Sequence, residues 1–197
     1  MCTESLKASY DLYTKRVSEV FIKLGFEVTS VHQVSDPVAL VNESESIAVG
    51  GGNTFHLVSE MQKTGIMDAI KERALDGMPY MGWSAGSNVA CPSLMTTNDM
   101  PIIEPPSFNC MGLIPFQINP HYLDANPKGH GGETREQRIE EFLVVNRTIQ
   151  VLGLREASML YVDGDNIKLL GSKDARLFMF GSKPKEFKVG SDLSFLL

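Results

Sequence analysis

Residues 79–90, PYMGWSAGSNVA, decide the fold class, because a short apolar strand pattern runs directly into a helical pattern at Ser84. The segment Gly82–Gly86 fits G-x-S-x-G, in which a sharp strand-to-helix turn lifts a serine hydroxyl clear of a sheet. The flanking glycines carry no Cβ atom that would clash in so tight a turn. Ser84 is therefore the candidate nucleophile, and an ordinary glycine-rich turn is the alternative interpretation.

Strand and helix patterns alternate on both sides of this turn. Helices are predicted over residues 8–24, 36–44, 54–77 (interrupted at Gly65) and 133–145, and strands over 26–34, 46–52, 115–120 and 149–154. A hairpin with an Asp-Gly-Asp turn is predicted over 159–171. Such alternation is typical of a parallel sheet with helices on both faces. The sequence therefore predicts one α/β domain over residues 1–197, three-layered and mostly parallel, with antiparallel strands near the C-terminus.

Composition excludes several classes of protein. The 197 residues carry a formal net charge of −6 without a block of Lys and Arg, which argues against nucleic acid as a partner. Neither a run of 18 apolar residues nor an apolar signal segment at the start is present, so no membrane partner is expected. Three scattered cysteines without C-x-x-C spacing favour a reducing compartment and no metal site. We expect a cytoplasmic protein.

The glycine run at residues 50–52 is a second candidate for chemistry. Three glycines that close a strand expose backbone N–H groups, which suit an oxyanion if the loop lies beside Ser84. A phosphate-binding loop is disfavoured, because no Lys-Ser or Lys-Thr follows and the G-x-G-x-x-G spacing fails at Phe55. A purely structural turn remains the alternative.

The candidate base is one of four histidines. Ligand sites in parallel α/β sheets gather at the carboxyl ends of strands, where Ser84 and His121 are both predicted to lie. His121 is therefore favoured over His130, which stands in a glycine-rich loop. His32 is placed in a predicted strand and His56 on a predicted helix.

The candidate acid is Glu156 or Asp99, each of which follows a strand end and could orient an imidazole. The order Ser84, His121, Glu156 differs from the order serine, acid, histidine of the α/β-hydrolases. Lipases and esterases of that class are therefore disfavoured.

Five segments together resemble the alpha-aspartyl dipeptidases, or peptidase E, a family of nonclassical serine peptidases. They occur in the order GGGNTFHL, GWSAGSNVACPS, TTNDMPI, FQINPHY and GETREQRI, and the resemblance runs from about Tyr10 to about Gly171. It implies a fold similar to the class I glutamine amidotransferases and hydrolysis of dipeptides with an N-terminal aspartate, Asp-X. It implies no cofactor.

The resemblance also implies roles for particular residues. Ser84 corresponds to the nucleophile, His121 to the base and Glu156 to the third member of the triad. The oxyanion donors would be the amides of Gly52 and Ala85. Asp99 and Arg135 would lie around the substrate, although Arg135 and Arg138 also fit a solvated helix face paired with nearby glutamates.

Two other functions stay open: a non-catalytic relative, and a cyanophycinase-like serine hydrolase that acts on aspartyl polymers. Family members begin with an additional strand–helix–strand unit ahead of the segment that matches residues 11–21. Strands without those neighbours would expose a sheet edge. We therefore expect lower stability, and pairing of the edge with a second copy as a homodimer.

Overall fold

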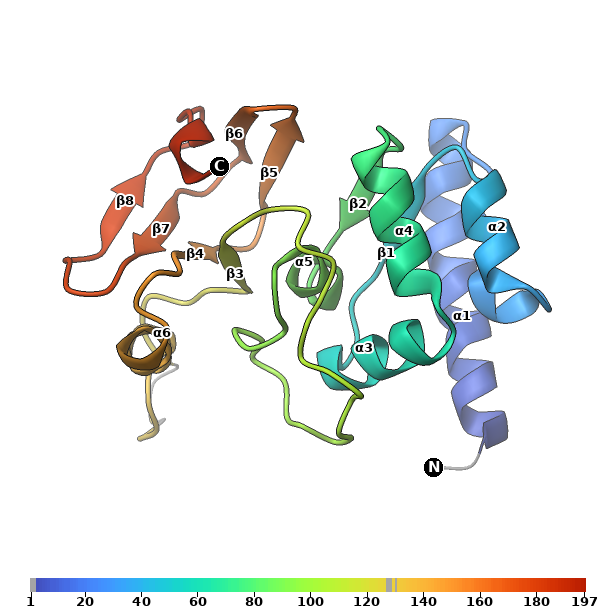
Figure 1. Cartoon of the computed structure of the whole chain (residues 1–197), viewed down its shortest axis with the longest axis horizontal. Helices are drawn as coiled ribbons and strands as arrows, with labels where there is room; N and C mark the ends of the chain where they lie inside the picture. Colours follow the sequence, from blue (N-terminus) through green and yellow to red (C-terminus); the bar gives the residue numbers. More distant parts are fainter. Residues whose placement is uncertain (1–2, 127–128, 130) are drawn as a thin grey trace. The chain divides into compact units, whose positions relative to one another are not determined.

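The computed structural model describes residues 3–126, 129 and 131–197, so His130 lies outside the described residues. The chain divides into two compact units, residues 1–44 and 45–197, and each is described by itself. Figure 1 labels the helices and strands in chain order. Among the helices of the described residues, none has both the length and the apolar character that a membrane span requires.

The first unit contains two α-helices, both predicted from the sequence. Helix α1 spans Thr3–Phe21 and continues as a 3-10 turn that ends at Gly25, whose φ of 88° takes the left-handed conformation natural to glycine. Helix α2 spans Pro37–Glu43. It begins where the side chain of Asp36 accepts a hydrogen bond from the amide of Ala39 at 2.9 Å, a common helix cap.

The strand predicted over residues 26–34 is wrong. The segment is irregular and contains a 3-10 turn at Val31–Gln33. A strand needs a neighbour to satisfy its backbone groups, and the described part of this unit holds none. Side chains fix the segment instead: the ring of His32 contacts Ser30 Oγ at 2.6 Å and Asp11 Oδ1 at 2.8 Å.

The second unit begins with a parallel pair of strands joined by two helices. Strands β1 (Ile47–Val49) and β2 (Tyr80–Gly82) pair in register. Helices α3 (Thr54–Lys63) and α4 (Ile66–Leu75) connect them and are separated at Gly65, whose φ is 75°. The predicted interruption of this helical stretch is confirmed.

The remaining strands form a mixed sheet and a hairpin. The sheet has the order β3 (Gln117–Pro120), β4 (Val151–Leu154), β7 (Ala175–Phe178) and β8 (Lys185–Phe187); the hairpin joins β5 (Ser158–Asp163) to β6 (Asn166–Gly171). Only β3 and β4 are parallel here. The predicted α/β class and the antiparallel C-terminal strands are confirmed. The described strands form one parallel pair, one mixed sheet and one antiparallel hairpin.

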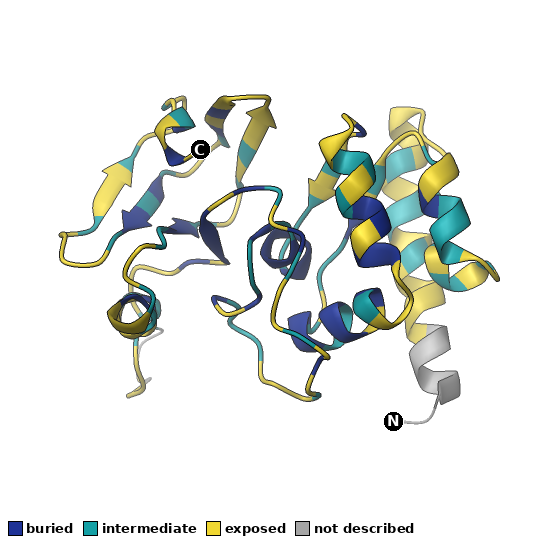
Figure 2. Ribbon diagram, in the orientation of Figure 1, coloured by how far each residue is buried: buried dark blue, intermediate teal, exposed yellow. Residues whose placement is uncertain are grey.

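Residues of this mixed sheet and of β6 in the hairpin belong to one cluster of buried hydrophobic residues; Figure 2 colours buried residues dark blue. Leu152, Leu169 and Leu177 are at most 1% exposed. Helix α6 (Arg135–Val145) adds Ile139 and Leu143 to a neighbouring cluster of buried residues that includes Tyr122, Val151 and Phe178. The ends of β3 and β4 therefore rest on a packed core, and the loops that follow them start from fixed positions.

Candidate active site

Ser84 occupies a strained turn between β2 and helix α5 (Ala85–Ala90). Its φ of 57° and ψ of −118° lie outside the regions that non-glycine residues prefer. A Cβ atom on Gly86 would lie 2.0 Å from the carbonyl oxygen of Val49, and one on Gly82 would lie 2.5 Å from that of Gly86. The glycines permit this close approach, so the structure contains the predicted strand-to-helix turn.

Hydrogen bonds hold this turn on both sides. The hydroxyl of Tyr80 donates to the carbonyl of Gly86 at 2.7 Å, and the amide of Trp83 donates to the carbonyl of Val49 at 3.2 Å. Burial raises the pKa of Tyr80 well above its usual value, so the phenol remains a donor. Tyr80 was not among the residues predicted from the sequence, where it stands only as one apolar strand residue.

The glycine loop after β1 lies directly against Ser84. A Cβ atom built on Gly51 would lie 3.0 Å from Ser84 Cβ and 3.2 Å from Ser84 Oγ. Gly52, with a φ of 144°, follows at once. The side chain of Asn53 then caps α3 by accepting from the amide of His56 at 3.1 Å. The loop is thus placed where its backbone can approach a group bound to Ser84.

Helix α5 aligns Ser84 with the end of β3. The side chain of Asn88 donates to the carbonyl of Ile118 at 3.0 Å, and the amide of Ile118 donates to Cys91 Sγ at 3.2 Å. Asn88, within α5, thus contacts the carbonyl of Ile118, and Cys91, directly after α5, contacts its amide. Helix and strand therefore run in opposite directions. The Ser84 end of α5 lies toward the end of β3 that leads into His121.

His121 and Glu156 are brought together by the pairing of β3 with β4. Pro120 pairs in register with Leu154, and the amide of Tyr122 donates to the carbonyl of Leu154 at 3.1 Å. His121 directly follows Pro120, Glu156 lies two residues after Leu154, and His121 Nδ1 is hydrogen-bonded to Glu156 Oε1. Glu156, not Asp99, is therefore the carboxylate beside this imidazole.

Two asparagines, which the sequence analysis did not single out, support the backbone at His121. Asn98 donates to the carbonyl of Pro120 at 2.7 Å, and Asn119 donates to Asn98 Oδ1 at 2.8 Å. The only signal in the sequence is that Asn98 precedes Asp99 and Asn119 lies two residues before His121.

Asp99 lies at the start of α3. Its Oδ2 accepts from the amide of Thr54 at 2.7 Å, from Thr54 Oγ1 at 2.6 Å and from Thr97 Oγ1 at 3.2 Å. A carboxylate at a helix N-terminus stabilises the helix. Asp99 thus has a structural task in addition to the substrate-binding role predicted for it.

Arg135, the first residue of α6, is partly desolvated. Burial lowers its pKa, the positive charge of Arg138 lowers it further, and the negative charge of Asp99 offsets part of this decrease. No side chain among the described residues forms a hydrogen bond or ion pair with its guanidinium. Arg138 instead pairs with Glu133 at 3.7 Å, so the solvated interpretation fits Arg138 and not Arg135.

A cysteine nucleophile and a metal ion are the other possible sources of chemistry. Cys91 is fully buried, and burial raises the pKa of its thiol to about 12, so it is a packed core residue. Among the residues that the structure describes, no group of three His, Cys, Asp or Glu side chains could hold a metal ion.

A serine at such a turn and a histidine–carboxylate pair after β3 and β4 are the groups that a serine hydrolase uses. Among the described residues, no hydrogen bond joins Ser84 to His121. Comparison with known proteins gives the family. The model of Peptidase family S51 matches residues 3–170. The chain belongs to this family and is a serine-type dipeptidase, as the resemblance implied.

Relatives named Peptidase E are similar over most of the chain. That of Streptomyces coelicolor is 54% identical over 191 residues, which cover 96% of this chain and 78% of the relative. The relative from Nostoc sp. is 47% identical over 193 residues, which cover 98% of this chain and 80% of the relative.

Two solved structures share the fold. A peptidase from an acI-B1 actinobacterium matches with a TM-score of 0.65 and 18% identity over 98% of this chain and 78% of its own. A putative Peptidase E from Listeria monocytogenes matches with a TM-score of 0.55 and 21% identity. The match covers 74% of this chain and 67% of the Listeria chain.

Proposed function

We propose that this peptidase hydrolyses dipeptides with an N-terminal aspartate through a triad of Ser84, His121 and Glu156. The observation that supports the triad best is the hydrogen bond between His121 Nδ1 and Glu156. This bond fixes the tautomer, because a proton on Nδ1 leaves Nε2 unprotonated and able to accept the proton of a serine hydroxyl.

In the proposed reaction Ser84 Oγ attacks the scissile carbonyl while its proton passes to His121 Nε2. The amides of Gly52 and Ala85 donate to the oxyanion that forms. His121 then gives the proton to the leaving amine, and the C–N bond breaks. Water, deprotonated by His121, hydrolyses the acyl-enzyme and releases aspartate. The position of Gly51 against Ser84 Oγ supports Gly52 as a donor.

The aspartate preference is assigned to Arg135 and Asp99. A guanidinium matches a short carboxylate with two parallel hydrogen bonds, and Asp99 carries the charge that complements the substrate ammonium. Arg135 lies within electrostatic reach of Asp99 and has no carboxylate partner among the described residues. A partly desolvated cation without a partner favours an anionic ligand.

The cytoplasm is the proposed compartment, because Cys91 and Cys110 are free.

A homodimer is also proposed. In the part of the chain that the structure describes, β1 hydrogen-bonds to β2 alone, so its other edge could pair with a second copy. Light scattering of the purified chain tests this proposal, and a monomer at micromolar concentration would contradict it.

The test of function is hydrolysis of Asp-Leu, compared with Asn-Leu and with a polymeric aspartyl substrate, using Ser84→Ala as the matched inactive control. Turnover of Asp-Leu above both other substrates is expected. Preference for the polymer would indicate a cyanophycinase-like hydrolase. No turnover of any substrate by a folded chain would indicate a non-catalytic relative.

A further inference from the structure

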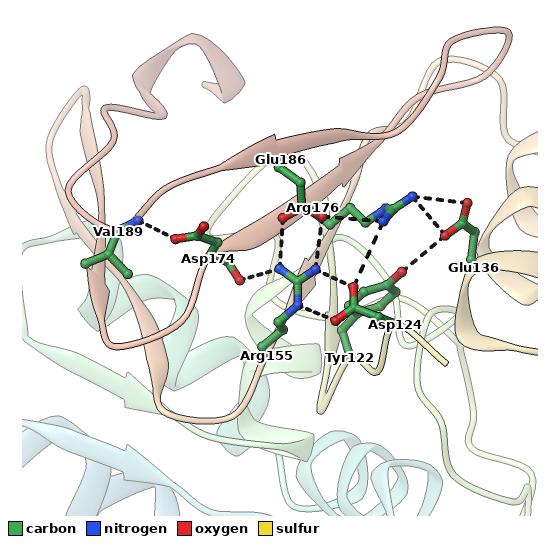
Figure 3. A network of polar contacts seen from close by, with 8 residues as sticks. All are labelled: Tyr122, Asp124, Glu136, Arg155, Asp174, Arg176, Glu186 and Val189. Atoms are coloured by element: carbon green, nitrogen blue, oxygen red, sulfur yellow. Dashed lines mark hydrogen bonds and ion pairs between the residues drawn. The ribbon is translucent and has the colours of Figure 1, made fainter. Parts of the chain in front are cut away.

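The side chain of Arg155, the residue before Glu156, is the centre of a polar network (Figure 3). Its Nε donates to Asp124 Oδ2 at 3.0 Å, and its Nη2 donates to Asp124 Oδ1. Nη1 donates to the carbonyl of Asp174 at 2.6 Å, and Nη1 and Nη2 each donate to a different carboxylate oxygen of Glu186 at 3.0 Å. Only 16% of the Arg155 side chain is exposed, so the guanidinium is largely enclosed by its partners.

The network joins the two chain segments that carry His121 and Glu156. Arg155 directly precedes Glu156, whereas Tyr122 directly follows His121 and Asp124 lies three residues after it. The guanidinium carbon of Arg155 is 5.4 Å from the centre of the Tyr122 ring, a distance at which cation and ring attract each other. One side chain therefore ties the segment after β4 to the segment after β3.

The His121–Glu156 pair needs such external support. The His121 side chain is 49% exposed and that of Glu156 is 73% exposed, so packing does little to hold either. His121 has a φ of 54°, and Ala157, next to Glu156, has a φ of 64°. Non-glycine residues keep this backbone conformation only where the surroundings impose it.

We propose that Arg155 is a positioning residue, which holds His121 and Glu156 in their catalytic alignment through its contacts with Asp124 and Tyr122. This proposal rests on the triad of the proposed function. Arg155 does not touch the substrate in this role. Its planar guanidinium satisfies Asp124, Glu186 and the Asp174 carbonyl at once, which the single ammonium group of a lysine cannot do.

The test compares Arg155→Lys with Arg176→Lys. Arg176 belongs to the same network and lies in β7, which carries no triad residue. It pairs with Glu136 at 3.1 Å, with Glu186 at 3.5 Å and, at the longest distance, with Asp124 at 4.0 Å. Arg155→Lys should lower kcat by about 10- to 100-fold and change KM by less than about 3-fold. Small displacements of catalytic groups slow the reaction but leave substrate binding largely unchanged. Arg176→Lys should leave both constants within about 3-fold.

A double variant separates positioning from general stability. Arg155→Lys made in the Glu156→Gln background should lower kcat by less than about 3-fold, since the group that it aligns is already lost. If Arg155→Lys does not fold, Asp124→Asn, a change at a half-exposed residue, takes its place with the same expectations.

Equal kinetic losses in Arg155→Lys and Arg176→Lys, or the same loss with and without Glu156, would overturn the positioning role. Failure of the triad itself is distinguishable, because Ser84→Ala or His121→Ala would then remain active. Loss of activity in those two variants, without a specific effect of Arg155→Lys, would contradict the positioning role alone.

Discussion

The hydroxyl of Tyr80 donates a 2.7 Å hydrogen bond to the carbonyl of Gly86, which joins the strand before Ser84 to the helix after it. Tyr80→Phe removes this donor, and the loss of one such hydrogen bond costs about 0.5–1.5 kcal/mol. We expect a loss of that size in the free energy of unfolding, measured in urea, and a fall in kcat because the turn at Ser84 loosens. The exposed Tyr161→Phe is the matched control. Equal stabilities of the two variants would contradict a role for this bond.

Ser84→Ala should abolish hydrolysis of Asp-Leu and leave the fold intact. The hydroxyl is the proposed nucleophile, and removal of a triad member costs several orders of magnitude in rate. Alanine adds no atom to the turn, so the melting temperature should change little. Retention of more than a few per cent of the activity would show that another group attacks the substrate.

His121→Ala should reduce kcat by several orders of magnitude, whereas His130→Ala should not. His121 is held between a strand end and Glu156. In the sequence, His130 stands between glycines in the segment KGHGG and does not follow a predicted strand. Steady-state kinetics of both variants check this, and similar losses would mean that the base has been assigned to the wrong histidine.

Arg135→Ala should remove the preference for Asp-Leu over Asn-Leu, because the partly desolvated guanidinium is the proposed partner of the substrate carboxylate. Arg135→Lys should raise KM for Asp-Leu more than Arg138→Lys does, since a lysine keeps the charge without the paired hydrogen bonds. Arg138 is the matched control because it is already paired with Glu133. An unchanged ratio of kcat/KM for the two substrates in Arg135→Ala would exclude Arg135 from the site.

The free energy of unfolding should depend on pH in part because of Asp124. The hydrogen bonds from Arg155 hold the pKa of Asp124 below its usual value. A carboxyl whose pKa is lower in the folded state stabilises the fold above its unfolded pKa of about 3.9, and this contribution is lost as the pH falls toward the folded pKa. In urea unfolding, Asp124→Asn should therefore be less stable than the unaltered chain at pH 7, with a difference that shrinks below about pH 4. A difference independent of pH would show that the carboxylate charge is not responsible.

The sequence predicts those parts of the site that depend on local chemistry. Glycines on both sides of Ser84 indicate the turn directly, and two apolar strands ending at Pro120 and Leu154 place the following residues at one edge of a sheet. The strand expected at residues 26–34 shows the limit of this reasoning: its apolar residues fit a strand, but pairing partners and the side chains of Ser30 and His32 decide the outcome.

Arg155 shows why the supporting contacts are harder to foresee. Its two carboxylate partners, Asp124 and Glu186, lie 31 residues before and 31 residues after it in the chain. Charged residues are common at such positions, and no local spacing distinguishes these from others. Only the fold brings them together.

Ser84, His121 and Ala157 are the non-glycine residues with a positive φ in the described part of the chain, and all three lie in the proposed triad or directly beside it. Each such residue costs about 1–3 kcal/mol. Selection for heat resistance would therefore favour replacements that relax these positions, such as glycine at residue 157, at the expense of turnover. Thermostable variants of this enzyme are best sought away from these three residues, on the exposed side of α4.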